Sequence, residues 1–287
     1  MALDRLFNLG FDLFAGISIL LLVSIGLAVI FGMRGIINLA HGEFIMLGAF
    51  ATLSGVRSGL NVWLAMLVAA VAVGAFGIVL ERLLIRRLYG RLFDTMLATW
   101  GVSLILVQVV DNHYGSVTEG IRVPVGSFTV GEFSMSAYNL IIMGAAAALT
   151  AGTFTVMRKT RYGLLARAAT QSPTMAQELG VNTSLVNMWT FGLGSALAGA
   201  AGALLAPLVG VIPTMGHTYV ARSFMTVIVG GPSFIAGTVS ASGLLGLVEN
   251  VTTNRFTPVI GQAMLLIAAI VILRFMPQGL TGRRYGR

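Results

Sequence analysis

The chain has 287 residues, of which 56% are hydrophobic and only 10% are charged. A soluble domain carries about 25% charged residues, so this composition excludes an ordinary soluble protein and indicates an integral membrane protein. The net charge of +8 falls in short basic clusters between apolar stretches, which argues against nucleic-acid binding, and the absence of cysteine excludes disulfides and thiolate chemistry.

The apolar stretches predict an all-α, polytopic membrane helical bundle of about eight spans, with broken or polar-interrupted helices, in one domain over residues 1–287. Asp4 and Asp12 do not suit a secretory signal, so the first stretch is expected to remain a membrane helix. The stretch Tyr219–Glu249 contains GGPSFIAG, which predicts a break into two arms near Pro232. The expected segments are Phe11–Phe31, Ile36–Leu53, Val62–Leu80, Phe93–Val110, Tyr138–Met157, Leu185–Val209, the two arms of Tyr219–Glu249, and Val259–Phe275.

The second segment, Ile36–Leu53, holds the polar residues Asn38, His41 and Glu43. Ionisable groups are costly in a membrane segment, so they indicate a functional site. Two interpretations stay open: with Gly42 these residues line a translocation path or gate, or they are mutual structural partners that lock helices together. Whether the segment crosses fully also stays open, and with it the side of the N-terminus. One histidine and one glutamate two residues apart offer too few ligands for a metal site.

A short internal duplication relates the sequence NLAHGEFIMLGAF to TMGHTYVARSFMTVIVG in the second half of the chain. In each copy a histidine follows a polar side chain by three residues, and an apolar arm follows the histidine. Corresponding interrupted segments in two halves of a transporter point to its central site. A match this short also arises by chance, so it supports the path interpretation only weakly.

Basic clusters predict the orientation of the bundle. The stretch Asp111–Ser136 carries Asp111, Glu119 and Glu132 against Arg122 alone. Under the positive-inside rule this stretch is expected outside, and the basic clusters, with the C-terminus, are expected in the cytoplasm. The clusters are Arg82, Arg86, Arg87 and Arg91; Arg158, Lys159, Arg161 and Arg167; and Arg274, Arg283, Arg284 and Arg287.

The longest predicted cytoplasmic loop, RKTRYGLLARAATQSPTMAQELGVNTS, contains two short helix patterns. In the second pattern Ser172 is the expected N-cap, Pro173 the first helical residue and Gly180 the stop. Two short helices with Arg167 and Glu178 exposed would form a docking knob for a soluble partner. The alternative interpretation is an ordinary amphipathic connector.

Arg222 and Glu249 belong to the two arms of the broken stretch, on the same predicted side of the membrane. An ion pair between them is expected to act as a structural clamp rather than as a substrate ligand. The sequence has no phosphate-binding loop, no nucleophile elbow and no His-Glu-x-x-His motif. We therefore expect neither an enzyme nor a cofactor.

Three segments resemble the inner-membrane permeases of branched-chain amino acid ABC transporters: Gly26–Phe50 with its Asn-x-Ala-His-Gly core, Arg161–Asn182, and the ending RFMPQGLTGR. Urea and short-chain amide permeases look much the same. The resemblance implies a permease subunit in the cell inner membrane that imports branched-chain or other small apolar amino acids by alternating access. It also implies four kinds of partner: a second permease subunit, homologous or identical; two cytoplasmic ATP-binding subunits; a periplasmic substrate-binding protein; and membrane lipid.

The resemblance also implies roles for particular residues. It places Asn38, His41, Gly42 and Glu43 in the family signature. A different class stays open, an ion-coupled carrier or channel that uses His41 and Glu43 as a proton relay. The resemblance implies a cytoplasmic coupling segment at about residues 158–184, with Gly163, Arg167, Ala168, Glu178 and Gly180 as the residues that couple to the ATP-binding subunit.

Overall fold

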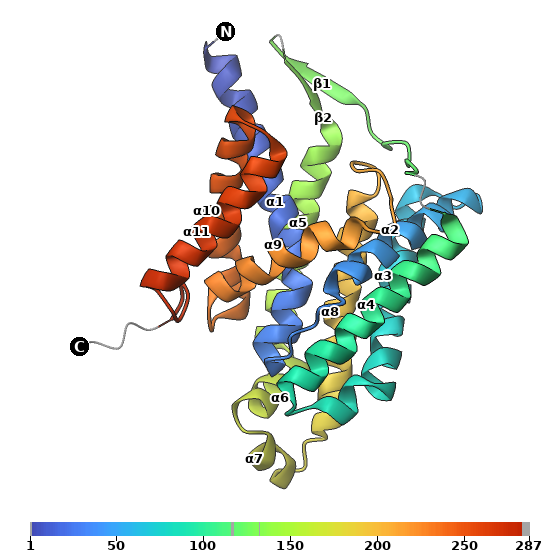
Figure 1. The fold of residues 1–287 in the computed structure, drawn as a ribbon, viewed down its shortest axis with the longest axis vertical. Helices are drawn as coiled ribbons and strands as arrows, with labels where there is room; N and C mark the ends of the chain where they lie inside the picture. The colour runs from blue at the N-terminus through green and yellow to red at the C-terminus, as the bar shows by residue number, and fades with distance from the viewer. Residues whose placement is uncertain (1, 116–117, 132, 283–287) are drawn as a thin grey trace.

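The computed structural model describes residues 2–115, 118–131 and 133–282, which form an almost entirely helical bundle (Figure 1). The strands β1 (Ser127–Val130) and β2 (Phe133–Ser136) pair as an antiparallel hairpin at one end, and two short helices lie at the other. We call these the hairpin end and the α6–α7 end. The helices are α1 (Ala2–Arg34), α2 (His41–Arg57), α3 (Val62–Leu83), the 3-10 helix η1 (Ile85–Leu88), α4 (Leu92–Tyr114), α5 (Ala137–Lys159), α6 (Arg161–Gln171), α7 (Pro173–Glu178), α8 (Thr183–Leu205), α9 (Met215–Gly230), α10 (Phe234–Arg255) and α11 (Pro258–Phe275).

Seven helices in the described part of the chain are long and apolar enough to cross a membrane: α1, α3, α4, α5, α8, α10 and α11. The predicted all-α membrane bundle is therefore confirmed. The helices α2 and α9 have 17 and 16 residues. At about 1.5 Å per residue, neither spans the roughly 30 Å hydrocarbon core by itself. A non-helical segment precedes each of them, at residues 35–40 and 206–214.

The predicted break near Pro232 is confirmed, because α9 and α10 are separate helices. Gly231, which follows α9, has a φ of 82°, in the left-handed region that glycine adopts without strain. The segment after α11 packs on this turn: the Leu280 N–H donates to the Val229 carbonyl at 2.7 Å. The chain segment beyond the last span therefore stabilises the break between α9 and α10.

The helix α8 lies in the centre of the bundle, where glycines let three other helices approach its backbone closely. A methyl group at Gly26 of α1 would lie 2.5 Å from the carbonyl oxygen of Gly194 in α8. A methyl group at Gly202 would overlap the carbonyl of Ile45 in α2, and one at Gly192 would lie 2.5 Å from Ile78 of α3. Small residues at such crossings are typical of packed membrane helices.

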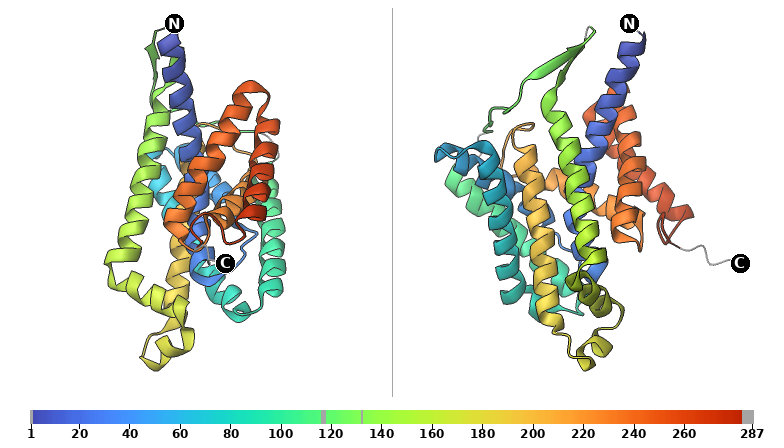
Figure 2. Two further views of the ribbon diagram at one scale, coloured as in Figure 1. Left: turned by 90° about the vertical axis from the view of Figure 1, so that its left-hand side faces the viewer. Right: turned by 180° about the vertical axis from the view of Figure 1, so that it is seen from behind.

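The helices alternate between the two ends of the bundle. The N-terminus lies at the hairpin end, and the loop between α3 and α4 lies at the α6–α7 end (Figure 2). The last turn of α1 also reaches the α6–α7 end, where the Thr170 hydroxyl of α6 donates to the Met33 carbonyl at 2.8 Å. The first two basic clusters therefore share one end. Arg283, Arg284, Arg287 and Glu132, which entered the predicted orientation, lie outside the described residues.

Candidate functional site

The helices α2 and α9 both begin inside the bundle, and their first turns cross there (Figure 1). Gly42 and Gly216 are in backbone contact at the crossing, since a methyl group at Gly216 would lie 2.7 Å from the carbonyl carbon of Gly42. Non-helical residues 35–40 lead to α2 from the α6–α7 end, and residues 206–214 lead to α9 from the hairpin end. Two half-length helices of opposite approach therefore meet in the interior, an arrangement found at transporter sites.

Glu43 reaches across this crossing to His217. The Oε1 atom of Glu43 lies 3.5 Å from Nδ1 of His217. The Glu43 side chain is buried, and its Oε2 atom has no hydrogen-bond partner among the described residues, whereas His217 is half exposed. The internal duplication matched His217 with His41. In the structure His217 corresponds instead to Glu43, two residues after His41. Glu43 and His217 each directly follow the glycine of their own helix at the crossing.

His41 faces α1 instead. Its Nε2 atom lies 2.8 Å from the carbonyl oxygen of Val23. A carbonyl only accepts hydrogen bonds, so Nε2 carries the proton and donates it. Ser223 of α9 donates to the same carbonyl at 3.0 Å. One carbonyl in the middle of α1 therefore joins α1, α2 and α9.

His41 and Glu43 thus fix helices through separate partners. No hydrogen bond or ion pair joins the two side chains to each other within the described chain. Asn38 is also fully buried, and its Oδ1 atom accepts from the Ala40 N–H at 3.2 Å, which shapes the turn before α2. The polar signature therefore positions the start of α2 against α1 and α9.

Replacing His41 with glutamine is expected to keep most of the protein's stability, because the amide group can still donate to Val23. His41→Ala removes that donor while Ser223 still donates to the carbonyl, so it is expected to lower the free energy of unfolding by about 0.5–1.5 kcal/mol. Thermal unfolding of the detergent-solubilised protein measures the difference. Equal melting temperatures for the two variants would contradict a positioning role for this hydrogen bond.

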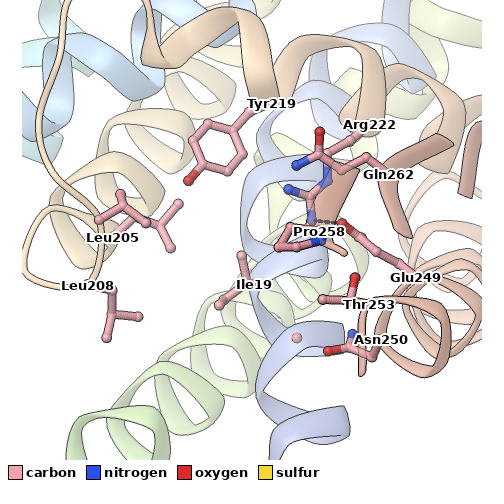
Figure 3. Close-up of a pocket in the computed structure, with 12 residues that line it drawn as sticks. Ile19, Leu205, Leu208, Tyr219, Arg222, Glu249, Asn250, Thr253, Pro258 and Gln262 are labelled. Atoms are coloured by element: carbon pink, nitrogen blue, oxygen red, sulfur yellow. Dashed lines mark ion pairs between the residues drawn. The ribbon is translucent and has the colours of Figure 1, made fainter. Parts of the chain in front are cut away.

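A pocket of about 260 Å³ lies beside α9 toward the hairpin end (Figure 3). Inside it Arg222 of α9 and Glu249 of α10 form an ion pair, with Nη2 2.6 Å from Oε1. Their side chains are only 13% and 10% exposed. The pocket is lined by Gly16, Ile19, Leu205, Leu208, Val209, Tyr219, Arg222, Glu249, Asn250, Thr253, Pro258 and Gln262, from α1, the end of α8 and its loop, α9, α10 and α11.

The two helices expected in the polar loop are present as α6 and α7. Ser172 is the N-cap of α7, and its hydroxyl accepts from the Met175 N–H at 3.4 Å. Pro173 is the first helical residue, and Gly180 follows the helix with a φ of 82°. The local prediction of a second short helix with these caps is confirmed.

The α6–α7 unit has a buried face and an exposed face. Gly163 is buried against the end of α5, where a methyl group would overlap the Met157 carbonyl. The other residues assigned to the coupling segment, Arg167, Ala168, Glu178 and Gly180, are all exposed. The same unit also exposes four apolar side chains: Leu164, Leu165, Met175 and Leu179.

Sequence reasoning missed His217 as the partner of Glu43, and it missed Ser223 and Tyr219 entirely. His217 had a signal, because it is the histidine on which the internal duplication was matched. Tyr219 and Ser223 lie in the same copy, but only as single polar residues in a helical pattern. No group of three or more His, Asp or Glu residues that could hold a metal ion occurs in the described ranges.

The sequence model of a protein family described as "Branched-chain amino acid transport system / permease component" matches residues 10–275. Relatives include the high-affinity branched-chain amino acid transport system permease proteins LivH of Escherichia coli and BraD of Pseudomonas aeruginosa. Each is 30% identical, over 91% of this chain and 91% of its own length. A probable branched-chain amino acid transport permease protein of Methanocaldococcus jannaschii is 27% identical, over 92% of this chain and 89% of its own. No solved structure matches.

Proposed function

Because this chain belongs to the family of branched-chain amino acid transport permeases, which are transport subunits rather than enzymes, we propose that it is the transmembrane subunit of an ATP-binding-cassette importer. Its proposed substrates are branched-chain or other small apolar amino acids, moved into the cell by alternating access. The observation that carries the coupling part of this proposal is the α6–α7 unit, which exposes apolar side chains beyond the ends of the spans.

The α6–α7 end is proposed to be cytoplasmic, because it gathers the first two basic clusters. The hairpin end, with the N-terminus, would then lie outside in this multi-pass inner-membrane protein. Two ATP-binding subunits would dock on the cytoplasmic side of the permease pair, and one of them would contact α6 and α7 of this chain. A periplasmic substrate-binding protein would dock at the hairpin end. A second permease subunit, homologous or identical, would complete the pair.

The contacts of α6 offer a route from the docked subunit to the crossing of α2 and α9. The Tyr162 hydroxyl hydrogen-bonds the Thr190 hydroxyl of α8 at 2.7 Å, and Thr170 binds the Met33 carbonyl of α1. The helices α1 and α8 in turn hold α2, through Val23 and through the glycine contacts. A shift of α6 during ATP binding would therefore move the helices that position the crossing.

Arg167→Ala and Glu178→Ala are expected to uncouple transport. Both side chains are exposed on the proposed docking surface, so their loss weakens subunit contact with little effect on folding. In proteoliposomes with all partner subunits, leucine uptake should be lost, and ATP hydrolysis should no longer respond to the substrate-binding protein. Arg87→Ala, which removes an exposed cation at the same end of the bundle but outside the α6–α7 unit, is the matched control. Normal uptake and stimulated hydrolysis in both α6–α7 variants would contradict the docking role.

A further inference from the structure

The pocket beside α9 divides into a charged side and an apolar side (Figure 3). The polar groups of Arg222, Glu249 and Gln262 lie together on one side. Leu205 and Leu208 lie opposite them, and Ile19 and Tyr219 lie between the two sides. A small molecule in this space would therefore meet charges at one end and hydrocarbon at the other.

The Arg222–Glu249 pair has hydrogen-bonding groups that a structural clamp between α9 and α10 does not use. A buried ion pair stabilises a fold only when its remaining donors are also satisfied. The Nε atom of Arg222 is buried without a hydrogen-bond partner in the described part of the structure. The parts of both side chains that remain accessible contribute to the pocket wall. The pair therefore presents one positive and one negative group to whatever enters.

We propose that this pocket binds the zwitterionic head of a small apolar amino acid. The α-carboxylate lies on the Arg222 guanidinium, the α-ammonium lies on the Glu249 carboxylate, and the side chain points toward Leu205 and Leu208. Charge-assisted hydrogen bonds of this kind are about twice as strong as neutral ones. This inference rests on the proposed function and deepens it, because it assigns a substrate subsite within the permease.

The size and chemistry of the pocket restrict the ligand. Pockets that bind drug-sized ligands have volumes of about 300–1,000 Å³, so a pocket of about 260 Å³ suits one small amino acid. Urea and simple amides carry no charge, so they would leave the Arg222–Glu249 pair without ionic partners. The apolar side gives a branched hydrocarbon side chain a matching surface.

The helix α9 connects this pocket with the crossing described above. Tyr219 and Arg222 line the pocket, whereas Gly216 and Ser223 contact α2 and α1 from the same helix. The rest of the wall comes from α1, the end of α8 and its loop, the last turns of α10 and the first two turns of α11. The pocket therefore occupies the half of the bundle nearer the hairpin end. In the proposed orientation, this is the half that receives substrate from outside.

Cysteine protection tests the pocket directly, because the chain contains no cysteine of its own. Val209→Cys places one thiol on the pocket wall, and Ser58→Cys places one at the same end of the bundle outside it. Each variant is assembled with its partner subunits in proteoliposomes, without the binding protein, and labelled with a maleimide. Leucine at ten times its Kd leaves about one-tenth of the sites empty. It should therefore slow labelling of Val209→Cys about tenfold and leave Ser58→Cys unchanged.

Two leucine analogues test the two charges without altering the pair. The amine 3-methylbutylamine lacks the carboxylate, and 4-methylpentanoate lacks the ammonium group, so neither should protect Val209→Cys at the same concentration. Arg222→Gln should remove protection by leucine as well. Equal protection by leucine and by both analogues would overturn the zwitterion assignment, as would leucine protection that survives Arg222→Gln.

Leucine uptake by the same vesicles, measured with the binding protein present, separates this inference from the proposed function. Uptake without any protection of Val209→Cys would overturn the pocket assignment alone. Failure to take up any amino acid would overturn the proposed function.

Discussion

The exchange Gly42→Ala is expected to abolish leucine uptake and to lower thermal stability. A methyl group at Gly42 would overlap the carbonyl oxygen of Gly216, and this obstacle is main chain rather than the end of a flexible side chain. No rotamer change relieves it, so the first turns of α2 and α9 must separate. Overpacking of a tight core costs about 1–3 kcal/mol. The melting temperature in detergent and leucine uptake in proteoliposomes measure the two effects.

Gly144→Ala and Gly101→Ala are the matched controls for this exchange. Both glycines lie within long helices, and a methyl group at either would meet no other atom within 4 Å. Alanine favours the helix over glycine by about 1 kcal/mol, so these variants should be as stable as the parent protein or more stable. If Gly42→Ala behaved like them in both stability and uptake, the close crossing would not be essential to transport.

The spans could be predicted from the sequence because their signals are local. Long apolar stretches with few charges predict membrane helices wherever they occur, and the glycines beside Pro232 predict a break whatever surrounds them. The caps of α7 are also local, since Ser172 and Gly180 act on their own neighbours in the chain. Each of these features depends on residues within one or two helical turns.

The crossing of α2 and α9 could not be predicted in this way. Its contacts join residues far apart in the chain, such as Glu43 with His217 and His41 with Val23. The partner of His41 is a backbone carbonyl, which every residue possesses and no pattern distinguishes. The short duplication did identify the two segments, but its register followed the histidines. In the structure the contact follows the glycines, because only they allow the backbones to touch.

The pocket beside α9 could not be predicted from the sequence either. Its walls come from five separate helices, and each contributes only one or a few residues. Gln262 is a single polar residue in the apolar first part of α11, and Asn250 stands among other polar residues in the last turns of α10. Both patterns are equally typical of structural hydrogen bonds. Asn250 in fact packs directly on Gly16, where a methyl group would displace its amide. Only the arrangement in space brings these groups around the Arg222–Glu249 pair.

The second large effect is expected from Arg222→Met, which leaves the Glu249 carboxylate buried without its partner. Removing one member of a buried ion pair costs about 3–5 kcal/mol, whereas replacing both with apolar residues is often neutral or stabilising. The double variant Arg222→Met with Glu249→Leu should therefore be more stable than Arg222→Met alone. Thermal unfolding of the parent protein, Arg222→Met, Glu249→Leu and the double variant forms a double-mutant cycle that measures the interaction between the two side chains.

This cycle distinguishes a clamp from a binding site, because the two roles predict different outcomes for the double variant. If the Arg222–Glu249 pair only joined α9 to α10, an apolar pair that restores stability would restore leucine uptake as well. If the pair also holds the charges of the substrate, the double variant should fold and still fail to transport, since hydrocarbon cannot replace either charge. Recovery of both stability and uptake would leave the pair with a purely structural role.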